Sequence, residues 1–203
     1  MPPRHLPNSL QHRAPIIPPP PLRPRWRQAA LALALAATMK GCATLPADGA
    51  APQAPVRAVP QVDLQRYAGR WYEIAAYPMV FQRQCVGDTT AEYALRSDGR
   101  IGVLNRCRTA SGHSQAQAVA WPVEGSGNAK LKVSFFWPFR ADYWVIGLAD
   151  DYRWAVVGDP GRRYLWLLAR TPEMAPADLE RAQEAARLQG YDLAPLRATR
   201  HGG

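Results

Sequence analysis

Eight short β-rich runs, separated by turn signals about ten residues apart, constrain the fold of this 203-residue chain more than any other feature. No segment between the runs has helical length, which excludes parallel strands joined by helices. Sequential strands joined by short loops pair antiparallel, and eight of them can close into an up-and-down barrel. The expected strands span residues 70–77, 88–95, 101–108, 114–123, 130–136, 142–149, 153–158 and 163–170. We therefore expect an all-β fold, an eight-stranded antiparallel barrel with room for one small ligand.

One helix follows the predicted strands. Pro176 suits a first helical turn and Gly190 suits the position just after a helix end. Between them Leu179, Ala182, Ala186 and Leu188 or Gln189 form an apolar stripe, while the opposite face is charged. We expect this helix to pack on the outside of the barrel, and residues 191–196 to add an outer strand or to run along the surface.

The first 60 residues have a different composition from the rest. They hold thirteen of the twenty prolines, so the folded part is expected to begin near residue 61. Within them Arg23, Arg25 and Arg27 precede an apolar run at 29–39, which is the pattern of a secretory signal and is too short to span a bilayer. The alternative is a short buried helix.

The end of the apolar run resembles a bacterial lipoprotein processing site. Gly41 and Cys42 fit that pattern, whereas Lys40 occupies a position that is normally small and uncharged. The resemblance implies lipidation of Cys42, and Ala43 in place of an acid implies sorting to the outer membrane. Plain signal cleavage and an uncleaved anchor remain alternatives. The expected division is 1–41 proline-rich extension and signal, 42–60 lipidated tether, 61–197 barrel domain and 198–203 tail.

The positive charge lies mainly outside the expected domain. The formal net charge is +9, but six of the 25 basic residues and no acid precede Cys42. A nucleic-acid-binding protein concentrates basic charge on its folded domain. We therefore expect no nucleic-acid partner.

Two cysteines remain if Cys42 carries lipid. Export would place Cys85 and Cys107 in an oxidising compartment, where a disulfide between them is expected. Two free buried thiols are the alternative.

Strand alternation predicts which side chains face the barrel interior. The small side chains of Ala91, Ala118, Gly147 and Ala155 favour a hollow interior over a filled one. The full inward set, predicted to line a cavity suited to an acyl chain, is Ala91, Tyr93, Leu95, Leu131, Val133, Phe135, Tyr143, Val145, Ala155 and Val157.

No catalytic or metal-binding pattern stands out. The sequence contains no nucleophile elbow, phosphate-binding loop, HExxH or CxxC, so we expect no enzyme activity, metal or cofactor. Glu73 shares the inward face with Trp71, and a buried acid needs partners or a raised pKa. Glu73 is expected either to anchor a polar head group or, as we favour, to make a structural pair.

Six motifs together resemble the lipocalin family, and specifically the bacterial outer-membrane lipocalins that are similar to apolipoprotein D. The first is Gly-Arg-Trp-Tyr-Glu-Ile at 69–74, and the resemblance covers about residues 61–197. The others are Asn-Arg-Cys at 105–107, Phe-Phe-Trp-Pro-Phe at 135–139, and the runs at 142–146, 152–158 and 164–172. Lys40 and the long proline-rich start depart from the family pattern.

The resemblance implies roles for individual residues. Gly69, Trp71 and Arg170 would be structural, with Arg170 stacked on Trp71 at the closed end of the barrel. Loops at 78–84 and 137–140 would form the mouth, with Phe81 and Phe139 as candidate ligand contacts. The basic residues Arg83 and Arg140 would either meet an anionic head group there or be ordinary solvated arginines.

The resemblance also implies a function. It predicts a fatty acid or lysophospholipid in the barrel, in a protein anchored by lipid to the outer membrane and facing the periplasm, with roles in lipid storage, transport or membrane maintenance. Two alternatives remain: an isomerase-type enzyme on the same fold, and a structural envelope lipoprotein with a filled barrel. Both a monomer and a homodimer are open.

Overall fold

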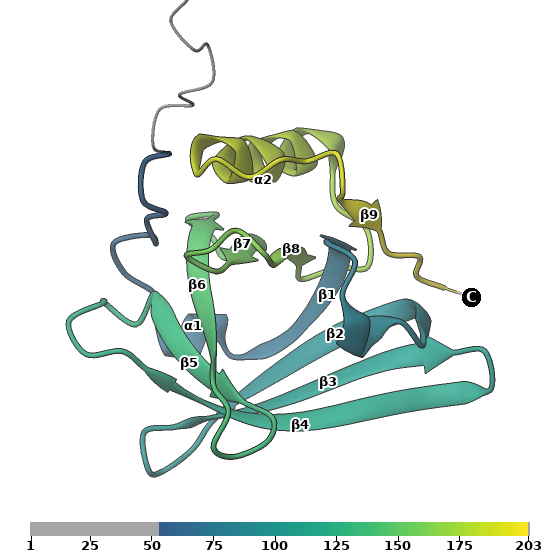
Figure 1. Ribbon diagram of the computed structural model, residues 1–203, viewed down its shortest axis with the longest axis horizontal. Coiled ribbons are helices and arrows are strands. Elements are labelled where there is room, and N and C mark those ends of the chain that lie inside the picture. The colour runs from purple at the N-terminus through teal and green to yellow at the C-terminus, as the bar shows by residue number, and fades with distance from the viewer. Residues whose placement is uncertain (1–52, 203) are drawn as a thin grey trace, which may run out of the picture. The chain divides into compact units, whose positions relative to one another are not determined.

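Eight antiparallel strands close into a barrel in the computed structural model, which describes residues 53–202 (Figure 1). Each strand pairs with its neighbours in sequence, as short connections require. The barrel strands are β1 (Gly69–Ala76), β2 (Cys85–Leu95), β3 (Ile101–Thr109), β4 (Gly112–Pro122), β5 (Lys130–Ser134), β6 (Ala141–Leu148), β7 (Trp154–Gly158) and β8 (Leu165–Ala169). The predicted fold class is therefore confirmed, with strand ends within a few residues of those expected.

Strand β1 closes the barrel by pairing along its two halves with different partners. Its first half, Gly69 to Tyr72, pairs with β2, and its second half, Tyr72 to Ala76, pairs with β8. Where β2 diverges, the short strand β9 (Arg197–Ala198) takes the free edge of β1. No strand was expected at that position, because two residues carry too little pattern to predict one.

The C-terminal segment, residues 197–202, continues past β9 and bridges β1 and β2. The amide of Thr199 donates to the Ile74 carbonyl at 2.9 Å, and the amide of Asp88 donates to the Arg200 carbonyl at 2.7 Å. Residues 198–203 were expected to be a tail outside the domain. Residues 197–202 instead occupy the seam where the pairing between β1 and β2 stops.

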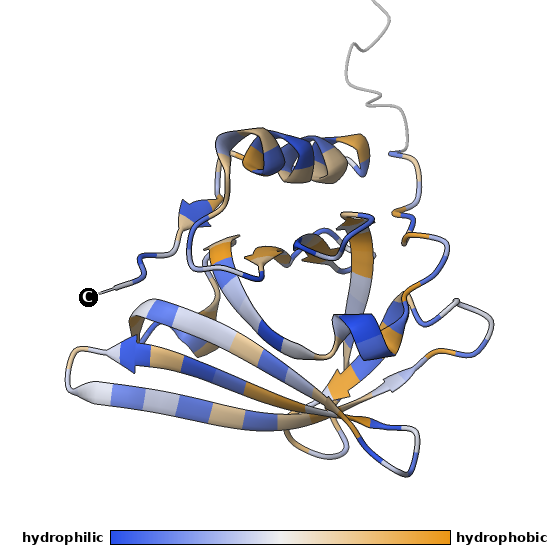
Figure 2. Cartoon of the chain, turned by 180° about the vertical axis from the view of Figure 1, so that it is seen from behind, coloured by the Kyte–Doolittle hydropathy of each residue, from blue (hydrophilic) through white to orange (hydrophobic). Residues whose placement is uncertain are grey.

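Helix α2 (Pro176–Leu188) packs on the outside of β6 and β7, as predicted (Figure 1). Ala182 and Ala186 are fully buried in a cluster with Ile146 and Val156, which point outward from the barrel. Hydropathy follows this arrangement: β4 alternates between hydrophilic and hydrophobic residues, whereas the second half of β6, which lies under α2, is mostly hydrophobic (Figure 2). A strand with an apolar outer face therefore marks the part of the barrel that the helix covers.

A bulge in β6 changes the side on which its residues face. The register shifts between Val145 and Gly147, so Val145 lies inside the barrel while Gly147 lies under α2. A Cβ atom added to Gly147 would lie 2.8 Å from the Cβ of Ala185. The interpretation of Gly147 as a sign of a hollow interior is therefore wrong, because this glycine permits close approach of the helix.

Residues 53–60 belong to the folded domain and are not a free tether. Val56 is buried in the cluster under α2, and the amide of Val59 donates to the Val145 carbonyl at 2.8 Å. Two short helices, α1 (Leu64–Tyr67) and the 3-10 helix η1 (Val80–Gln82), were not predicted. The predictions for the signal, for Cys42 and for residues 43–52 lie outside the described residues. Within residues 53–202, no helix has the length and hydropathy needed to span a membrane.

Candidate functional site

The closed end of the barrel is sealed by Trp71 and Arg170. The Trp71 side chain is fully buried, and its Nε1 donates to the Tyr67 carbonyl at 2.8 Å. The Arg170 guanidinium lies 3.9 Å from the centroid of the indole ring, which confirms the predicted cation–π pair. Both residues lie beneath the apolar interior and therefore act as structural residues.

Arg170 also ties the elements of the closed end together. Its Nη1 donates to the carbonyls of Ala68 at 3.0 Å and Arg70 at 2.9 Å, and its Nη2 donates to that of Arg66. Partial burial lowers the pKa of this guanidinium, which nevertheless stays charged. Gly69 lies beside it with φ +91°, a conformation that favours glycine. This backbone conformation explains why the family signature begins with glycine at this position.

The interior above this floor is apolar and contains nine of the ten residues predicted to face inward. They belong to one cluster with residues that strand alternation also places inside, such as Val103, Ala118 and Leu168. The predicted residues found there are Ala91, Tyr93, Leu95, Leu131, Val133, Tyr143, Val145, Ala155 and Val157.

The inner face of β4 is uncovered toward the open end of the barrel, where, among the described residues, β4 pairs with β3 alone. Ala116 shares the inward face of β4 with Ala118 and Ala120, which are buried, yet Ala116 itself is exposed. An inward-facing side chain is exposed only where no other side chain covers it. The space beside Ala116 is therefore accessible, whereas the side chains below it are buried.

Three tyrosine hydroxyls meet in the lower part of the barrel. The Tyr143 hydroxyl lies 2.8 Å from the Tyr67 hydroxyl and 2.8 Å from the Tyr93 hydroxyl. Burial raises the pKa of all three, to about 12 for Tyr93, so they remain neutral phenols. The sequence singled out Tyr93 and Tyr143 as cavity residues but missed Tyr67, which comes from α1.

Asn105 is a further inward-facing residue that the inward set missed. It alternates with Ile101, Val103 and Cys107, all of which are buried. Its Oδ1 atom is buried and has no hydrogen-bond partner among the described residues. The alternation of β3 could have predicted that Asn105 faces inward, but this residue was considered only as part of a family motif.

Phe135 is the predicted cavity residue that does not face inward. Strand β5 ends at Ser134, and Phe135 begins a loop that folds over the outer face of β4. It lines an outer groove of about 870 Å³ together with Trp121, Trp137 and Arg140. The alternation argument fails here because the strand is shorter than its apolar pattern.

Arg140 and Phe139 also lie away from the barrel interior. The Arg140 guanidinium stacks on the outside, 4.8 Å from the ring centroid of Trp121 and 4.9 Å from that of Trp137. Phe139 is largely exposed in the same loop. The expectation that Arg140 meets a ligand head group is not supported by this placement.

Phe81 lies in η1, in the loop between β1 and β2. Its ring centroid is 5.9 Å from that of Tyr164, which lies in the loop between β7 and β8. Both loops are at the end opposite Trp71, so Phe81 lies at the mouth as predicted. Arg83 is exposed next to η1, and its Nε donates to the Val80 carbonyl at 3.2 Å.

Glu73 is buried and has structural partners. Its carboxylate accepts hydrogen bonds from Gln82 Nε2 at 2.8 Å and Thr199 Oγ1 at 2.6 Å. Burial raises the pKa of Glu73, and these two hydrogen bonds partly oppose the shift. Glu73 therefore links β1 to η1 and to the C-terminal segment, which is the structural role that the sequence favoured.

Cys85 and Cys107 form a disulfide, as predicted. The bond joins the start of β2 to the end of β3, where two register shifts interrupt the pairing of these strands. Neither sulfur is a free thiol in this structure. Among residues 53–202, no group of three His, Cys, Asp or Glu residues is arranged to hold a metal ion.

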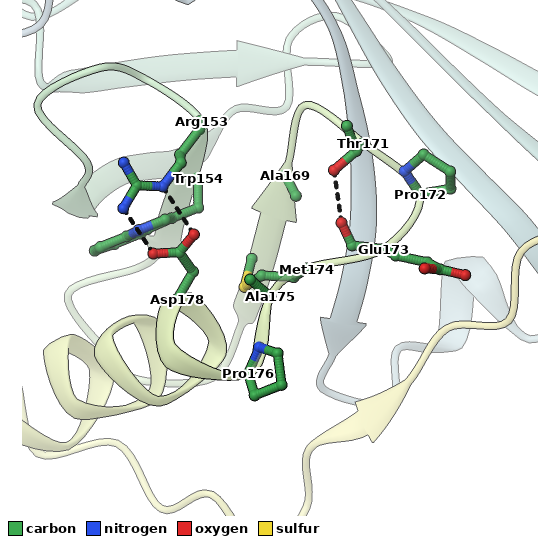
Figure 3. Close-up of a pocket in the computed structure, with 10 residues that line it drawn as sticks. All are labelled: Arg153, Trp154, Ala169, Thr171, Pro172, Glu173, Met174, Ala175, Pro176 and Asp178. Atoms are coloured by element: carbon green, nitrogen blue, oxygen red, sulfur yellow. Dashed lines mark hydrogen bonds and ion pairs between the residues drawn. The ribbon is translucent and has the colours of Figure 1, made fainter.

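Besides the groove near Phe135, a pocket of about 580 Å³ lies outside the barrel at the start of α2 (Figure 3). Arg153 there donates to both carboxylate oxygens of Asp178 at 2.8 Å, and this pairing lowers the pKa of Asp178. The ion pair fixes the first turn of α2 against the strand β7. This pocket is thus part of the helix-docking contact and is separate from the barrel interior.

Comparisons with known proteins agree with this geometry. A lipocalin-like domain model matches residues 62–201. Temperature-induced lipocalin-1 of Arabidopsis thaliana is 38% identical over 146 residues, covering 68% of this chain and 78% of that protein. Outer membrane lipoprotein Blc of Vibrio cholerae is 37% identical over 157 residues, covering 76% of this chain and 87% of that protein.

A solved structure shares the fold. Insecticyanin from the tobacco hornworm Manduca sexta superposes with a TM-score of 0.61 at 18% identity, covering 72% of this chain and 85% of that one. At this identity the likeness concerns the fold alone. With the domain match over residues 62–201 and relatives at 37–38% identity, the chain belongs to the lipocalin-like family.

Proposed function

We propose that the protein is a lipid-binding outer-membrane lipocalin that holds a fatty acid or lysophospholipid in its barrel, for lipid storage, transport or membrane maintenance. The observation that carries this proposal is the exposure of the inward-facing Ala116 above a filled floor. An apolar cavity that opens at one end suits an acyl chain. Transfer of apolar surface from water contributes about 25 cal/mol per Å², reduced by the costs of association.

The proposed location rests on the relatives and on the amino terminus. Several relatives are named outer membrane lipoproteins, and Gly41-Cys42 provides a candidate acylation site in this chain. A lipid on Cys42 would hold the barrel at the periplasmic face of that membrane. The length of chain between Cys42 and the first described residue, 53, would separate the barrel from the bilayer.

The proposal includes binding without turnover. An isomerase-type mechanism would need a reactive thiol or acid inside the barrel. The disulfide occupies both Cys85 and Cys107, and the inward acid Glu73 is hydrogen-bonded to Gln82 and Thr199. The exposure of Ala116 favours an open cavity over a filled, purely structural barrel, in which side chains would cover this residue.

The test is binding of a fluorescent fatty acid to the full chain held in amphipol, followed by displacement with unlabelled fatty acid and lysophospholipid. Saturable one-to-one binding without chemical change of the lipid is expected. Ala116→Trp should abolish it by filling the cavity, while Gln115→Trp, on the outward face of the same strand, should not. Binding that is equal in both variants, or absent from the well-folded wild type, would overturn the proposal.

A further inference from the structure

The inner wall of the barrel carries polar groups whose hydrogen-bonding capacity the described protein does not fill. The Oδ1 atom of Asn105 is buried without a partner, and no side-chain hydrogen bond of Asn105 is present among residues 53–202. Leaving a buried polar atom unpaired costs about 1–3 kcal/mol. Such an atom on a cavity wall is a candidate for ligand recognition.

Space adjoins the Asn105 amide on both sides. Its cross-strand partners are Ala91 on β2 and Ala116 on β4, both with small side chains. Ala116 is the residue whose exposure marks the hollow part of the barrel. Asn105 therefore lies at the boundary between the filled floor and the open cavity.

The tyrosine cluster below Asn105 supplies a second such group. Tyr67, Tyr93 and Tyr143 have three hydroxyl protons, but only two hydrogen bonds join their oxygen atoms. Whichever direction these bonds take, one phenol proton has no acceptor among the described residues. Tyr93 pairs with Val103, the next inward-facing residue of β3 before Asn105. Tyr93 and Asn105 are therefore diagonal neighbours, and the Cα atoms of such residues lie about 7–8 Å apart.

The charge of the wall limits the kind of ligand group that fits. The described inward-facing residues of the eight strands include no Lys or Arg, since Arg106, Arg108, Lys130 and Lys132 all face outward. The tyrosines are neutral, because burial raises their pKa values. A carboxylate placed here would lose its hydration without gaining a cation.

We propose that Asn105 and the hydroxyls of Tyr67, Tyr93 and Tyr143 form a polar subsite inside the barrel that binds a neutral hydroxyl group of an acyl lipid. A hydroxyl can donate a hydrogen bond to the Asn105 oxygen and can accept the remaining phenol proton, whereas an ester oxygen or a carboxylate can only accept. This inference rests on the proposed lipid-binding function and narrows the ligand to acyl lipids with a free hydroxyl.

The experiment compares lipids that share one acyl chain and differ only in the polar group. The full chain in amphipol is loaded with a fluorescent fatty acid, which is displaced by monopalmitoylglycerol, palmitate or methyl palmitate. Two hydrogen bonds of ordinary strength should favour monopalmitoylglycerol over methyl palmitate by about tenfold. Asn105→Leu should remove this preference without weakening methyl palmitate binding, and Tyr143→Phe should reduce it by about threefold.

The controls separate this inference from the proposed function. Gln115→Leu places a similar substitution on the outward face of the neighbouring strand and should leave the preference unchanged. If bound water alone satisfies these polar groups, the wild type will bind monopalmitoylglycerol and methyl palmitate equally, and only the subsite is overturned. If no lipid displaces the probe, or the probe does not bind, the proposed function itself fails. The wild-type preference tests the subsite even where a variant does not fold.

Discussion

The two ends of the barrel are stabilised in different ways. At the closed end, one buried indole and one guanidinium connect α1, β1 and β8 through stacking and through hydrogen bonds to backbone carbonyls. At the open end, the Phe81 side chain of η1 is exposed, and β2 and β3 are joined by a disulfide where their pairing is irregular. The comparison teaches that side-chain packing stabilises the closed end, whereas a covalent bond stabilises the open end.

The largest expected effect comes from the floor. Trp71→Ala should lower the free energy of unfolding by about 3–5 kcal/mol, because it leaves a cavity in a fully buried site. Trp137→Ala is the matched control, since that side chain is 74% exposed, and should change stability by less than about 0.5 kcal/mol. Urea unfolding measures both. Equal losses in the two variants would contradict the assignment of Trp71 to a packed, stabilising floor.

Removal of the disulfide should cause the second largest loss of stability. Cys85 and Cys107 are 22 residues apart, and a loop of that length corresponds to about 3 kcal/mol in the chain-entropy model. A double Cys85→Ala, Cys107→Ala variant should lose about this much, measured by urea unfolding. Reducing agent should destabilise the wild type similarly and leave the double variant unaffected. A wild type that is insensitive to complete reduction would show that the rim does not depend on the bond.

The Arg170 contacts should contribute less. Arg170→Met keeps much of the side-chain volume but removes the charge and the hydrogen bonds to three carbonyls, so a loss of about 2 kcal/mol is expected. Arg140→Met removes a cation that stacks on the half-buried Trp121 and the exposed Trp137, and should cost about 0.5–1 kcal/mol. Thermal unfolding of both variants ranks them, and the reverse order would contradict the structural role given to Arg170.

The smallest effect depends on pH and concerns Glu73. Its pKa in the folded protein is raised above the ordinary value of 4.5 by burial, so its contribution to stability is largest at low pH and is lost as pH rises through the folded-state pKa. Glu73→Gln keeps a donor and an acceptor for Gln82 and Thr199 and does not ionise. The stability of this variant relative to wild type should therefore increase from pH 4 to pH 8. A difference that is constant over this range would show that Glu73 is not destabilised by burial.

Local pattern was sufficient to predict most of the barrel. Alternation placed Ala91, Tyr93 and Val133 inside, because a strand with one solvent-exposed face alternates clearly between polar and apolar residues. The same argument failed at Gly147, where a bulge shifts the register, and at Phe135, where the strand stops early. Bulges and strand ends depend on contacts with distant elements, such as α2 over β6, and those contacts are not present in the local sequence.

The candidate site was predicted less completely than the fold. The apolar lining followed from alternation, but the hydrogen-bonding groups within it did not. Tyr67 reaches the interior from α1, a helix too short to give a sequence pattern. Residues 53–60 and 198–202 were assigned to a tether and a tail because they are polar or proline-rich, although their backbones pair with β6, β1 and β2.

The seam formed by residues 197–202 has a consequence for the order in which the molecule is built. Strand β1 is the first barrel strand to leave the ribosome, yet its partners β8 and β9 are among the last elements made. Until then β1 has only β2 as a neighbour, and its remaining edge is free to pair with another chain. Barrel closure therefore requires nearly the whole chain, and a chain that lacks its C-terminal strands would leave an edge of β1 open to self-association.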